Sequence, residues 1–374
     1  MIESISLENF KCFRKQYINF RNLTILAGLN ASGKTTVIQS LLLTRQTLRD
    51  PSYVDQLVLR DHLGFVGKMS DLLFYGAEED SIKIDIRFCN EDSPLQLHTK
   101  KIDTGSDSCS IHSIRKEFLK SLLRFSLFSN DFQFLEAERW GPRLFLNQSE
   151  HFVRSNREIG SKGEYIGQFL EEFDKQKLVN DVLKHRSEDS NTIALQIDAW
   201  LGDISPNVRV LHKSIPNIDA FQMRYAFAKE RKVPDDFRAT NVGFGISYAL
   251  PVVVALLTPF PNNLLIIENP ESHLHPYGQA ALGRMIACAA AAGHQIIIET
   301  QSDHILNGIR VAVLEAILKP DQISTVFFTS KEDSLEPKVD FPKMDERGRY
   351  DFWPEGFFDQ WEKSLKKLVK REQQ

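Results

Sequence analysis

The chain has 374 residues, a formal net charge of −4 and 42% hydrophobic side chains, so it can form two or three domains around a sizeable core. The weak negative charge argues against a surface that attracts nucleic acid over its whole extent. The four cysteines are far apart and form no Cys-x-x-Cys pair, which predicts a reducing compartment and no structural zinc. The chain starts without an apolar signal core, and its apolar runs are too short to span a bilayer. We therefore expect a cytoplasmic protein with no membrane partner.

Short strands surround one glycine-rich loop near the start of the chain. Apolar or alternating runs predict strands over 2–7, 17–20, 23–27 and 81–88. Residues 28–35 read Gly-Leu-Asn-Ala-Ser-Gly-Lys-Thr and match G-x-x-x-x-G-K-S/T, the phosphate-binding loop. The loop follows the strand 23–27 and precedes a helical pattern that starts at Lys34, which is the order that phosphate binding requires. The motif and its context together predict a nucleotide site.

Each special residue of this loop has a predicted role. Gly28 and Gly33 allow the backbone to wrap a phosphate without a Cβ clash, and free N–H groups at the helix start point at the anion. Lys34 is expected to reach the β- and γ-phosphates of ATP, and Thr35 to ligate Mg²⁺ through its hydroxyl. The residues expected to bind the nucleotide are Gly28, Asn30, Ala31, Ser32, Gly33, Lys34, Thr35 and Thr36.

The middle of the chain carries weaker signals. An apolar stretch over 118–128 predicts a helix, and Phe132–Leu135 predicts a strand that ends in Glu-Ala-Glu-Arg. Residues 165–183 and 191–201 have helical patterns, and 222–227 is a further candidate strand. No heptad run before residue 240 is long enough for a coiled-coil arm. We expect 145–235 to be a mainly helical insertion or lid.

Two apolar strands, 263–267 and 295–298, are joined by an alanine-rich helix over 276–292. This pattern is a βαβ unit with a right-handed crossover. The first strand ends at Glu268 and the second at Glu299, and ligands of parallel sheets bind at the carboxyl ends of the strands. We therefore expect both acidic ends to meet the nucleotide, with Glu268 as the acid that holds Mg²⁺.

Asn269 departs from the pattern of a fast ATPase. A glutamate directly after the magnesium acid would polarise the attacking water, but a neutral amide cannot accept a proton. Hydrolysis is then slow, or another group takes over. We assign Glu271 as the helper and Gln301 as the sensor of the γ-phosphate, because a glutamine orients water in GTPases. The residues expected to take part in catalysis are Lys34, Glu268, Asn269, Glu271 and Gln301.

A second glycine-rich turn precedes a helical pattern within 239–257. Gly243 and Gly245 lead to Ser247 at the expected helix start, where free N–H groups and a hydroxyl would form another anion site. One nucleotide does not need two such sites in one chain. A head-to-tail homodimer does need them, because each nucleotide is then closed between the loop of one copy and this turn of the other. A tight turn before a core helix is the plainer alternative.

These segments together resemble the RecF/SMC/OLD branch of ABC-type ATPases. The likeness rests on the opening ISLENFKCF, the loop segment LTILAGLNASGKTT, the turn NVGFGIS and the segments LLIIENPESHLHP and IIIETQSDHILNGI. The tail GRYDFWPEGFFDQ is similar to the short C-terminal domain of unknown function in a bacterial subgroup of AAA-family ATPases. Residues 136–143 (EAERWGPR) resemble a motif of that subgroup, which suggests that Arg139 senses or frames the nucleotide.

The resemblance implies an α/β fold, namely a P-loop NTPase with an ABC-type head. A mixed antiparallel N-terminal β-lobe would join a parallel-sheet core and the helical insertion. The expected parts are an N-terminal ATPase lobe (1–144), the insertion (145–235), a C-terminal ATPase lobe (236–324) and a short C-terminal domain (325–374). OLD relatives carry a nuclease domain after the ATPase, but too few residues follow Gln301 for one here.

The expected function is that of an ATPase that binds ATP, hydrolyses it slowly and dimerises around Mg²⁺–ATP. The resemblance implies control of a separately encoded effector, such as a nuclease, in anti-phage defence. The alternative is a DNA-binding ATPase of the RecF/SMC repair or maintenance type, for which DNA is the partner.

Overall fold

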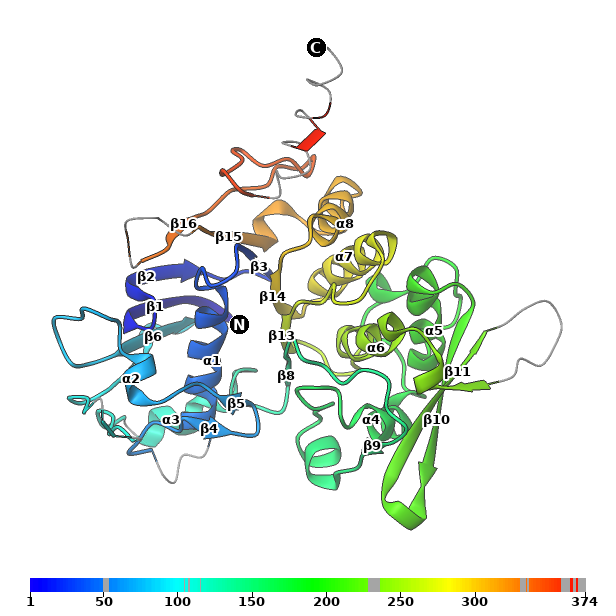
Figure 1. The fold of residues 1–374 in the computed structure, drawn as a ribbon, viewed down its shortest axis with the longest axis horizontal. Helices are drawn as coiled ribbons and strands as arrows, with labels where there is room; N and C mark the ends of the chain where they lie inside the picture. Colours follow the sequence, from blue (N-terminus) through cyan, green and yellow to red (C-terminus); the bar gives the residue numbers. More distant parts are fainter. Residues whose placement is uncertain are drawn as a thin grey trace.

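The computed structural model describes residues 1–357 except 50–53, 104, 107, 115, 228–235, 330–333 and 335, together with 364, 365 and 368. Two lobes lie on either side of a central sheet (Figure 1). The α/β class with a parallel-sheet core, expected from the sequence, is confirmed. Across the described part of the chain, no helix combines the length and the apolar character needed to cross a bilayer.

The first lobe is built on an antiparallel sheet in the order β2-β1-β6-β7. Its strands are β1 (Ile2–Phe10), β2 (Phe13–Asn19), β6 (Lys83–Phe88) and β7 (Leu95–His98). Ile5 and Leu7 point into the core, whereas Glu8 lies on the other face and pairs with Lys83 at 2.6 Å. The helix α1 (Lys34–Leu48) shares one hydrophobic cluster with this sheet. Shorter elements are β4 (Arg60–Asp61), β5 (Gly64–Phe65), α2 (Met69–Leu72) and α3 (Lys116–Leu122).

The central sheet has the strand order β16-β15-β3-β14-β13-β8. Its strands are β3 (Leu23–Gly28), β8 (Phe132–Leu135), β13 (Leu264–Glu268), β14 (Gln295–Thr300), β15 (Ile323–Thr329) and β16 (Lys338–Asp340). All run parallel except β16, which is antiparallel to β15 at the edge. The carboxyl ends of β3, β13 and β14 therefore meet at one edge of the sheet, which positions the site described below.

The strand β15 was not predicted, and it changes the expected division of the chain. It crosses the boundary expected between residues 324 and 325, and it pairs directly with β3, the strand before the glycine loop. The central sheet thus includes residues that the sequence had assigned to the C-terminal domain. The partner strand lies about 300 residues away in the chain, so no local pattern indicates the pairing.

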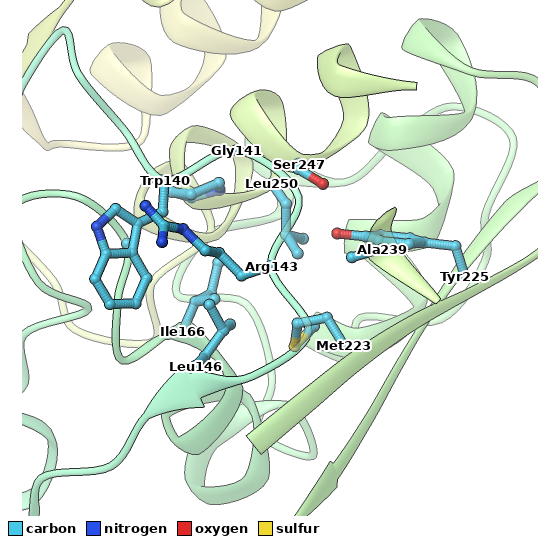
Figure 2. A pocket seen from close by; sticks show the side chains of 12 residues that line it. Trp140, Gly141, Arg143, Leu146, Ile166, Met223, Tyr225, Ala239, Ser247 and Leu250 are labelled. Atoms are coloured by element: carbon cyan, nitrogen blue, oxygen red, sulfur yellow. The ribbon is translucent and has the colours of Figure 1, made fainter. Parts of the chain in front are cut away.

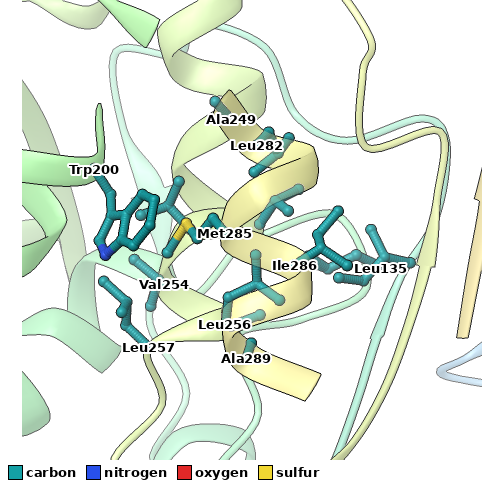
Figure 3. Packing of buried hydrophobic residues seen from close by; sticks show 14 of the residues in the cluster. Leu135, Trp200, Ala249, Val254, Leu256, Leu257, Leu282, Met285, Ile286 and Ala289 are labelled. Carbon is teal, nitrogen blue, oxygen red and sulfur yellow. The ribbon is translucent and has the colours of Figure 1, made fainter. Parts of the chain in front are cut away.

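Helices cover the face of the central sheet that is turned away from the first lobe (Figure 1). They are α4 (Ile166–Phe173), α5 (Ile193–Ile204), α6 (Phe244–Leu256), α7 (Pro276–Ala291) and α8 (Asp303–Leu314). Short single-turn helices lie at His151–Ser155, Asp181–Leu183, Pro216–Ile218, Ala239–Asn241 and Pro320–Gln322. Trp200 of α5, Val254 of α6 and Met285 of α7 pack in one buried cluster with the sheet (Figure 3).

Residues 145–235 contain a β-hairpin as well as helices, which differs from the mainly helical insertion expected. Strands β10 (Val208–Ile215) and β11 (Ala220–Phe227) form the hairpin, and β11 also pairs with β12 (Asp236–Arg238) and β9 (Leu146–Asn147). The sequence of β10 does not show a clear alternation of apolar and polar residues, because the inward position 212 is a histidine. His212 faces α4, where its ring lies 3.1 Å from Glu171 and 3.0 Å from Asp174. Tyr225 and Trp200 join the cluster that contains α6 and α7, so this segment belongs to the core of the second lobe.

Candidate nucleotide-binding site

The loop over 28–35 joins β3 to α1 through backbone that requires glycine. Gly28 has φ +140°, and a Cβ there would lie 2.1 Å from the carbonyl oxygen of Phe328 in β15. Gly33 has φ +101° and is the N-cap of α1, and a Cβ there would lie 2.9 Å from Cys12 Sγ. Both positions combine a left-handed backbone with a close approach, so neither accommodates a side chain without strain. Neighbouring strands thus fix the path of the loop.

A buried ammonium group lies inside the loop. Lys34 Nζ donates to the carbonyl oxygens of Gly28 at 3.0 Å and Leu29 at 2.6 Å, and only 3% of Lys34 is exposed. Ser32 Oγ donates to the same Leu29 carbonyl at 2.7 Å. Burial lowers the pKa of Lys34 below its ordinary value, and the nearby Glu299 carboxylate opposes this shift. An ammonium group beside the free N–H groups of a helix start fits a phosphate.

Two glutamates end neighbouring strands beside this loop. Glu268 of β13 and Glu299 of β14 are paired in register. Glu299 Oε2 accepts a hydrogen bond from Thr35 Oγ1 at 2.8 Å, and Glu299 Oε1 lies 3.8 Å from Lys34 Nζ. Glu268 Oε2 accepts a hydrogen bond from the Ala137 N–H at 3.1 Å. The sequence led us to expect both acidic strand ends at the nucleotide, and the hydrogen bond from Thr35 shows how Glu299 contacts the loop.

The surroundings of both carboxyl groups favour a cation. Burial raises the pKa of Glu268 to about 7, and the negative charge of Glu299 adds to this effect. Burial also raises the pKa of Glu299, against the hydrogen bond from Thr35 and the charge of Lys34. A divalent cation relieves the repulsion between two such carboxylates.

Oxygen atoms of Thr35, Glu268 and Glu299 are the ligands that Mg²⁺ prefers. Within the described ranges, no three His, Cys, Asp or Glu side chains are grouped so that they could hold a metal ion by themselves. The side chains at this edge therefore fit Mg²⁺ bound together with a nucleotide phosphate.

Glu271 and Gln301 lie at the same edge and differ in how strongly they are engaged. Glu271 Oε2 accepts a hydrogen bond from Thr300 Oγ1 at 2.8 Å, and Glu271 Oε1 accepts one from the Gln301 N–H at 2.9 Å. The side chain of Gln301 is exposed, and its Nε2 donates to Asn30 Oδ1 at 2.6 Å. Gln301 thus contacts the phosphate loop, whereas both carboxylate oxygens of Glu271 hold the end of β14.

Asn269 occupies a left-handed backbone position, with φ +42°. Its N–H donates to the Glu299 carbonyl oxygen at 2.8 Å, which continues the pairing of β13 and β14. Asparagine tolerates this backbone region better than glutamate does. The amide that stands where a catalytic glutamate was expected therefore suits the turn after β13.

Ser247 does not lie at the exposed start of α6, which corrects the role expected for it at an anion site. The helix begins after Gly243, which is exposed. Ser247 is one turn further along and only 8% exposed, and its hydroxyl faces Tyr225 beside a cavity of about 20 Å³ (Figure 2). Gly245 faces the chain that follows β13, because a Cβ there would lie 2.8 Å from the His273 carbonyl oxygen. Gly245 thus permits close packing, and Gly243 alone of the three is exposed.

Arg139 joins three segments of the chain through their backbone. Only 1% of the residue is exposed. Its guanidinium group donates to the carbonyl oxygens of Glu268 at 2.7 Å, Asn269 at 2.7 Å, Glu136 at 3.0 Å and Tyr248 at 3.2 Å. These bonds fix the backbone around Glu268. The role that the resemblance suggests for Arg139, to sense or frame the nucleotide, stays a prediction.

Residues 23–307 match the protein family described as "AAA domain, putative AbiEii toxin, Type IV TA system". Residues 318–368 match the family described as "Protein of unknown function (DUF3696)". No curated protein sequence matches this chain.

Two solved structures of Smc heads have a similar fold. One is the SmcHead bound to the C-winged helix domain of ScpA, with 15% identity and a TM-score of 0.57 over 92% of this chain and 98% of that chain. The other is the Smc head domain with an extended coiled coil, bound to the C-terminal domain of ScpA from Pyrococcus furiosus. It has 13% identity and a TM-score of 0.54 over 99% of each chain. The likeness supports the fold and covers nearly the whole chain.

Proposed function

This chain belongs to the AAA-domain family that matches residues 23–307, and we propose that it binds Mg²⁺–ATP and closes into a homodimer around the nucleotide. It is an AAA-type ATPase whose fold is related to that of Smc heads. In each copy the loop 28–35 holds the phosphates, and Thr35 and Glu268 hold Mg²⁺. The exposed turn at Gly243 of the other copy then covers the nucleotide. Bound Mg²⁺ neutralises charge on the phosphates.

The hydrogen bond between Thr35 and Glu299 carries this proposal. It links the first turn of α1 to the end of β14 across 264 residues of sequence. Glu268 lies next to Glu299 in register, and Lys34 Nζ lies 3.8 Å from the Glu299 carboxylate. A phosphate-binding loop and a cluster of cation ligands therefore share one edge of the sheet, which is the arrangement that a magnesium–nucleotide complex needs.

We propose that hydrolysis is slow. Asn269 cannot accept a proton, and both oxygens of Glu271 already accept hydrogen bonds. Gln301 contacts Asn30 in the loop through its amide, so it can orient a water molecule near the γ-phosphate. An amide can position water without removing its proton, which favours a long-lived closed dimer.

We propose that the closed dimer controls a separately encoded effector protein in the cytoplasm, as part of anti-phage defence. The family description names a toxin of a toxin–antitoxin system. The two Smc heads of similar fold are bound to domains of another protein, ScpA. The second observation supports a surface that another protein recognises, and the first supports a role in a system with a toxin component.

Calorimetric titration with ATP and Mg²⁺ tests nucleotide binding. Replacing Lys34 with alanine should weaken binding about a hundredfold, because truncating one partner of a buried charge pair costs roughly 2–5 kcal/mol. Lys15→Ala is the matched control, because Lys15 is exposed on β2. Wild type that takes up no adenine or guanine nucleotide would refute the proposal.

Phosphate release and light scattering test turnover and closure. Wild type should form a dimer in Mg²⁺–ATP and release phosphate slowly. Rapid release that is lost in Lys34→Ala would contradict slow hydrolysis while preserving the site. Strong stimulation by duplex DNA that falls steeply with salt would favour the DNA-binding alternative over a protein effector.

A further inference from the structure

Arg139 connects the end of β13 to the second turn of α6. Its guanidinium group bonds the carbonyl oxygens of Glu268 and Asn269 on one side and of Tyr248 on the other. Burial lowers the pKa of Arg139 to about 10, so the group remains charged at neutral pH. A charge buried to this degree is tolerated only where its donors are satisfied. The carbonyl oxygens supply those acceptors, and together they form a stiff junction.

A second contact joins the same two segments. The chain after β13 places the His273 carbonyl oxygen where a Cβ on Gly245 would lie 2.8 Å away. The rings of His273 and Tyr248 are 4.3 Å apart. The first two turns of α6 are thus packed against the turn that follows Glu268, and the Arg139 guanidinium group lies 5.8 Å from the centre of the same Tyr248 ring. The junction is held by polar bonds and by close packing.

We propose that Arg139 is a positioning residue that couples the two nucleotide sites of the dimer. This inference rests on the proposed function, in which Glu268 serves the nucleotide of its own copy and the start of α6 covers that of the other copy. Because Arg139 bonds the end of β13 and the second turn of α6, a shift of the β13 end when Mg²⁺–ATP binds also moves this helix and, with it, the turn at Gly243 where it starts. Nucleotide binding in one copy then favours closure over the nucleotide of the second.

The test compares dimerisation with nucleotide binding in single copies. Sedimentation velocity gives the dimer Kd with and without Mg²⁺–ATP. The coupling ratio is the Kd without Mg²⁺–ATP divided by the Kd with it. Titration of a fluorescent ATP analogue at low protein concentration gives the affinity of the monomer. Arg139→Met should lower the coupling ratio roughly tenfold or more, a larger factor than any loss of monomer affinity that follows from its bonds to the backbone around Glu268. Arg139→Lys should fall between, because an ammonium group cannot reach all the carbonyl oxygens.

Arg45→Met is the matched control for loss of a buried arginine. Arg45 has 0% exposure and also donates to backbone carbonyls, those of Leu127 and Ser129, but it bonds neither β13 nor α6. It should leave the coupling ratio within about twofold of wild type, although it costs stability.

The outcomes separate the inference from the proposed function. If wild type does not dimerise with Mg²⁺–ATP, the proposed function fails and this inference fails with it. If wild type dimerises but folded Arg139→Met keeps the coupling ratio, or Arg45→Met lowers it equally, only the inference is overturned. If Arg139→Met does not fold, Gly245→Ala tests the same junction from the His273 side. An unchanged coupling ratio in Gly245→Ala would then overturn the inference.

Discussion

Glu268 and Glu299 end adjacent parallel strands in register, and only Glu299 reaches the Thr35 hydroxyl. Glu268 instead accepts a hydrogen bond from the Ala137 backbone. The two carboxyl groups thus differ in their partners: Glu299 accepts the hydrogen bond of the loop hydroxyl, and Glu268 is buried with one backbone hydrogen bond. Burial disfavours the charged form of Glu268 and, together with the nearby Glu299 carboxylate, raises its pKa to about 7, so this residue titrates near neutrality.

The stability of the nucleotide-free protein should fall as pH rises through neutrality. The pKa of Glu268 is higher in the folded than in the unfolded state, so folding retains a proton that the unfolded chain releases. This contribution is fully present below the unfolded-state pKa and is lost as pH rises towards about 7 and above. Urea denaturation should show that Glu268→Gln removes part of the decline between roughly pH 5 and pH 8. Glu78→Gln, at a side chain that is 90% exposed, should not.

Stabilisation by Mg²⁺ and ATP should increase with pH over the same range. A carboxyl group must lose its proton before it ligates a metal ion, and the raised pKa of Glu268 places that loss near neutrality. The increase in melting temperature caused by Mg²⁺–ATP should therefore be larger at pH 8 than at pH 6. EDTA should remove the difference between the two pH values. An equal shift at both would argue that Glu268 does not hold Mg²⁺.

Gly28→Ala should be strongly destabilising because of its neighbour rather than its backbone angle alone. Gly28 and Gly64 have similar φ angles, +140° and +133°, but nothing lies within 4 Å of a Cβ on Gly64. Gly64→Ala should cost about 1–3 kcal/mol from backbone strain. Gly28→Ala adds a clash with the Phe328 carbonyl oxygen, so it should cost clearly more and weaken ATP binding. Chemical denaturation measures the stability of both variants, and titration measures their affinity for ATP. An equal loss of stability in both would show that β15 moves to make room for the Cβ at position 28.

Asn269→Glu should lose about 1 kcal/mol of stability, because glutamate is less tolerant of a left-handed backbone than asparagine. Asn269→Gly should stay close to wild type. Asn90→Glu is the control for backbone strain, because Asn90 is also left-handed, with φ +63°, and is exposed. The rate of phosphate release from Asn269→Glu then measures separately whether a glutamate at this position speeds hydrolysis. If Asn269→Glu is as stable as wild type, the turn does not constrain this residue.

Ser247→Ala should leave nucleotide-dependent dimerisation within about twofold of wild type, since the hydroxyl is buried and faces Tyr225. Gly243→Glu should oppose dimerisation, because the added carboxylate would repel the phosphates of the nucleotide that this turn is proposed to cover. The monomer should accept this change, as nothing lies within 4 Å of a Cβ on Gly243. Light scattering with Mg²⁺–ATP measures both variants. Loss of the dimer in Ser247→Ala alone would restore the role first expected for Ser247.

The local sequence was sufficient for the loop and for the strand β3 that leads to it, whereas β2 (Phe13–Asn19) begins four residues before the predicted strand 17–20. The strand 132–135 was predicted with the bounds that β8 has, and the helix 276–292 corresponds to α7 with one residue fewer. Such elements could be predicted because the spacing of apolar residues within a buried strand or helix is visible over a few neighbouring positions. The hairpin strand β10 was missed, because an inward histidine that pairs with carboxylates looks like a surface residue in the sequence.

By itself, the sequence determined the phosphate-binding loop, the acidic end of β13 and the class of the fold, since each depends on neighbours within a few residues. The tertiary structure decided which side chains meet there. Thr35 bonds Glu299 only because β3 and β14 are adjacent in the sheet, and Arg139 is enclosed only because α6 packs against the end of β13. Strand order and packing join residues that are far apart in the chain, and these contacts, not residue type, give Glu299, Arg139 and Ser247 their places.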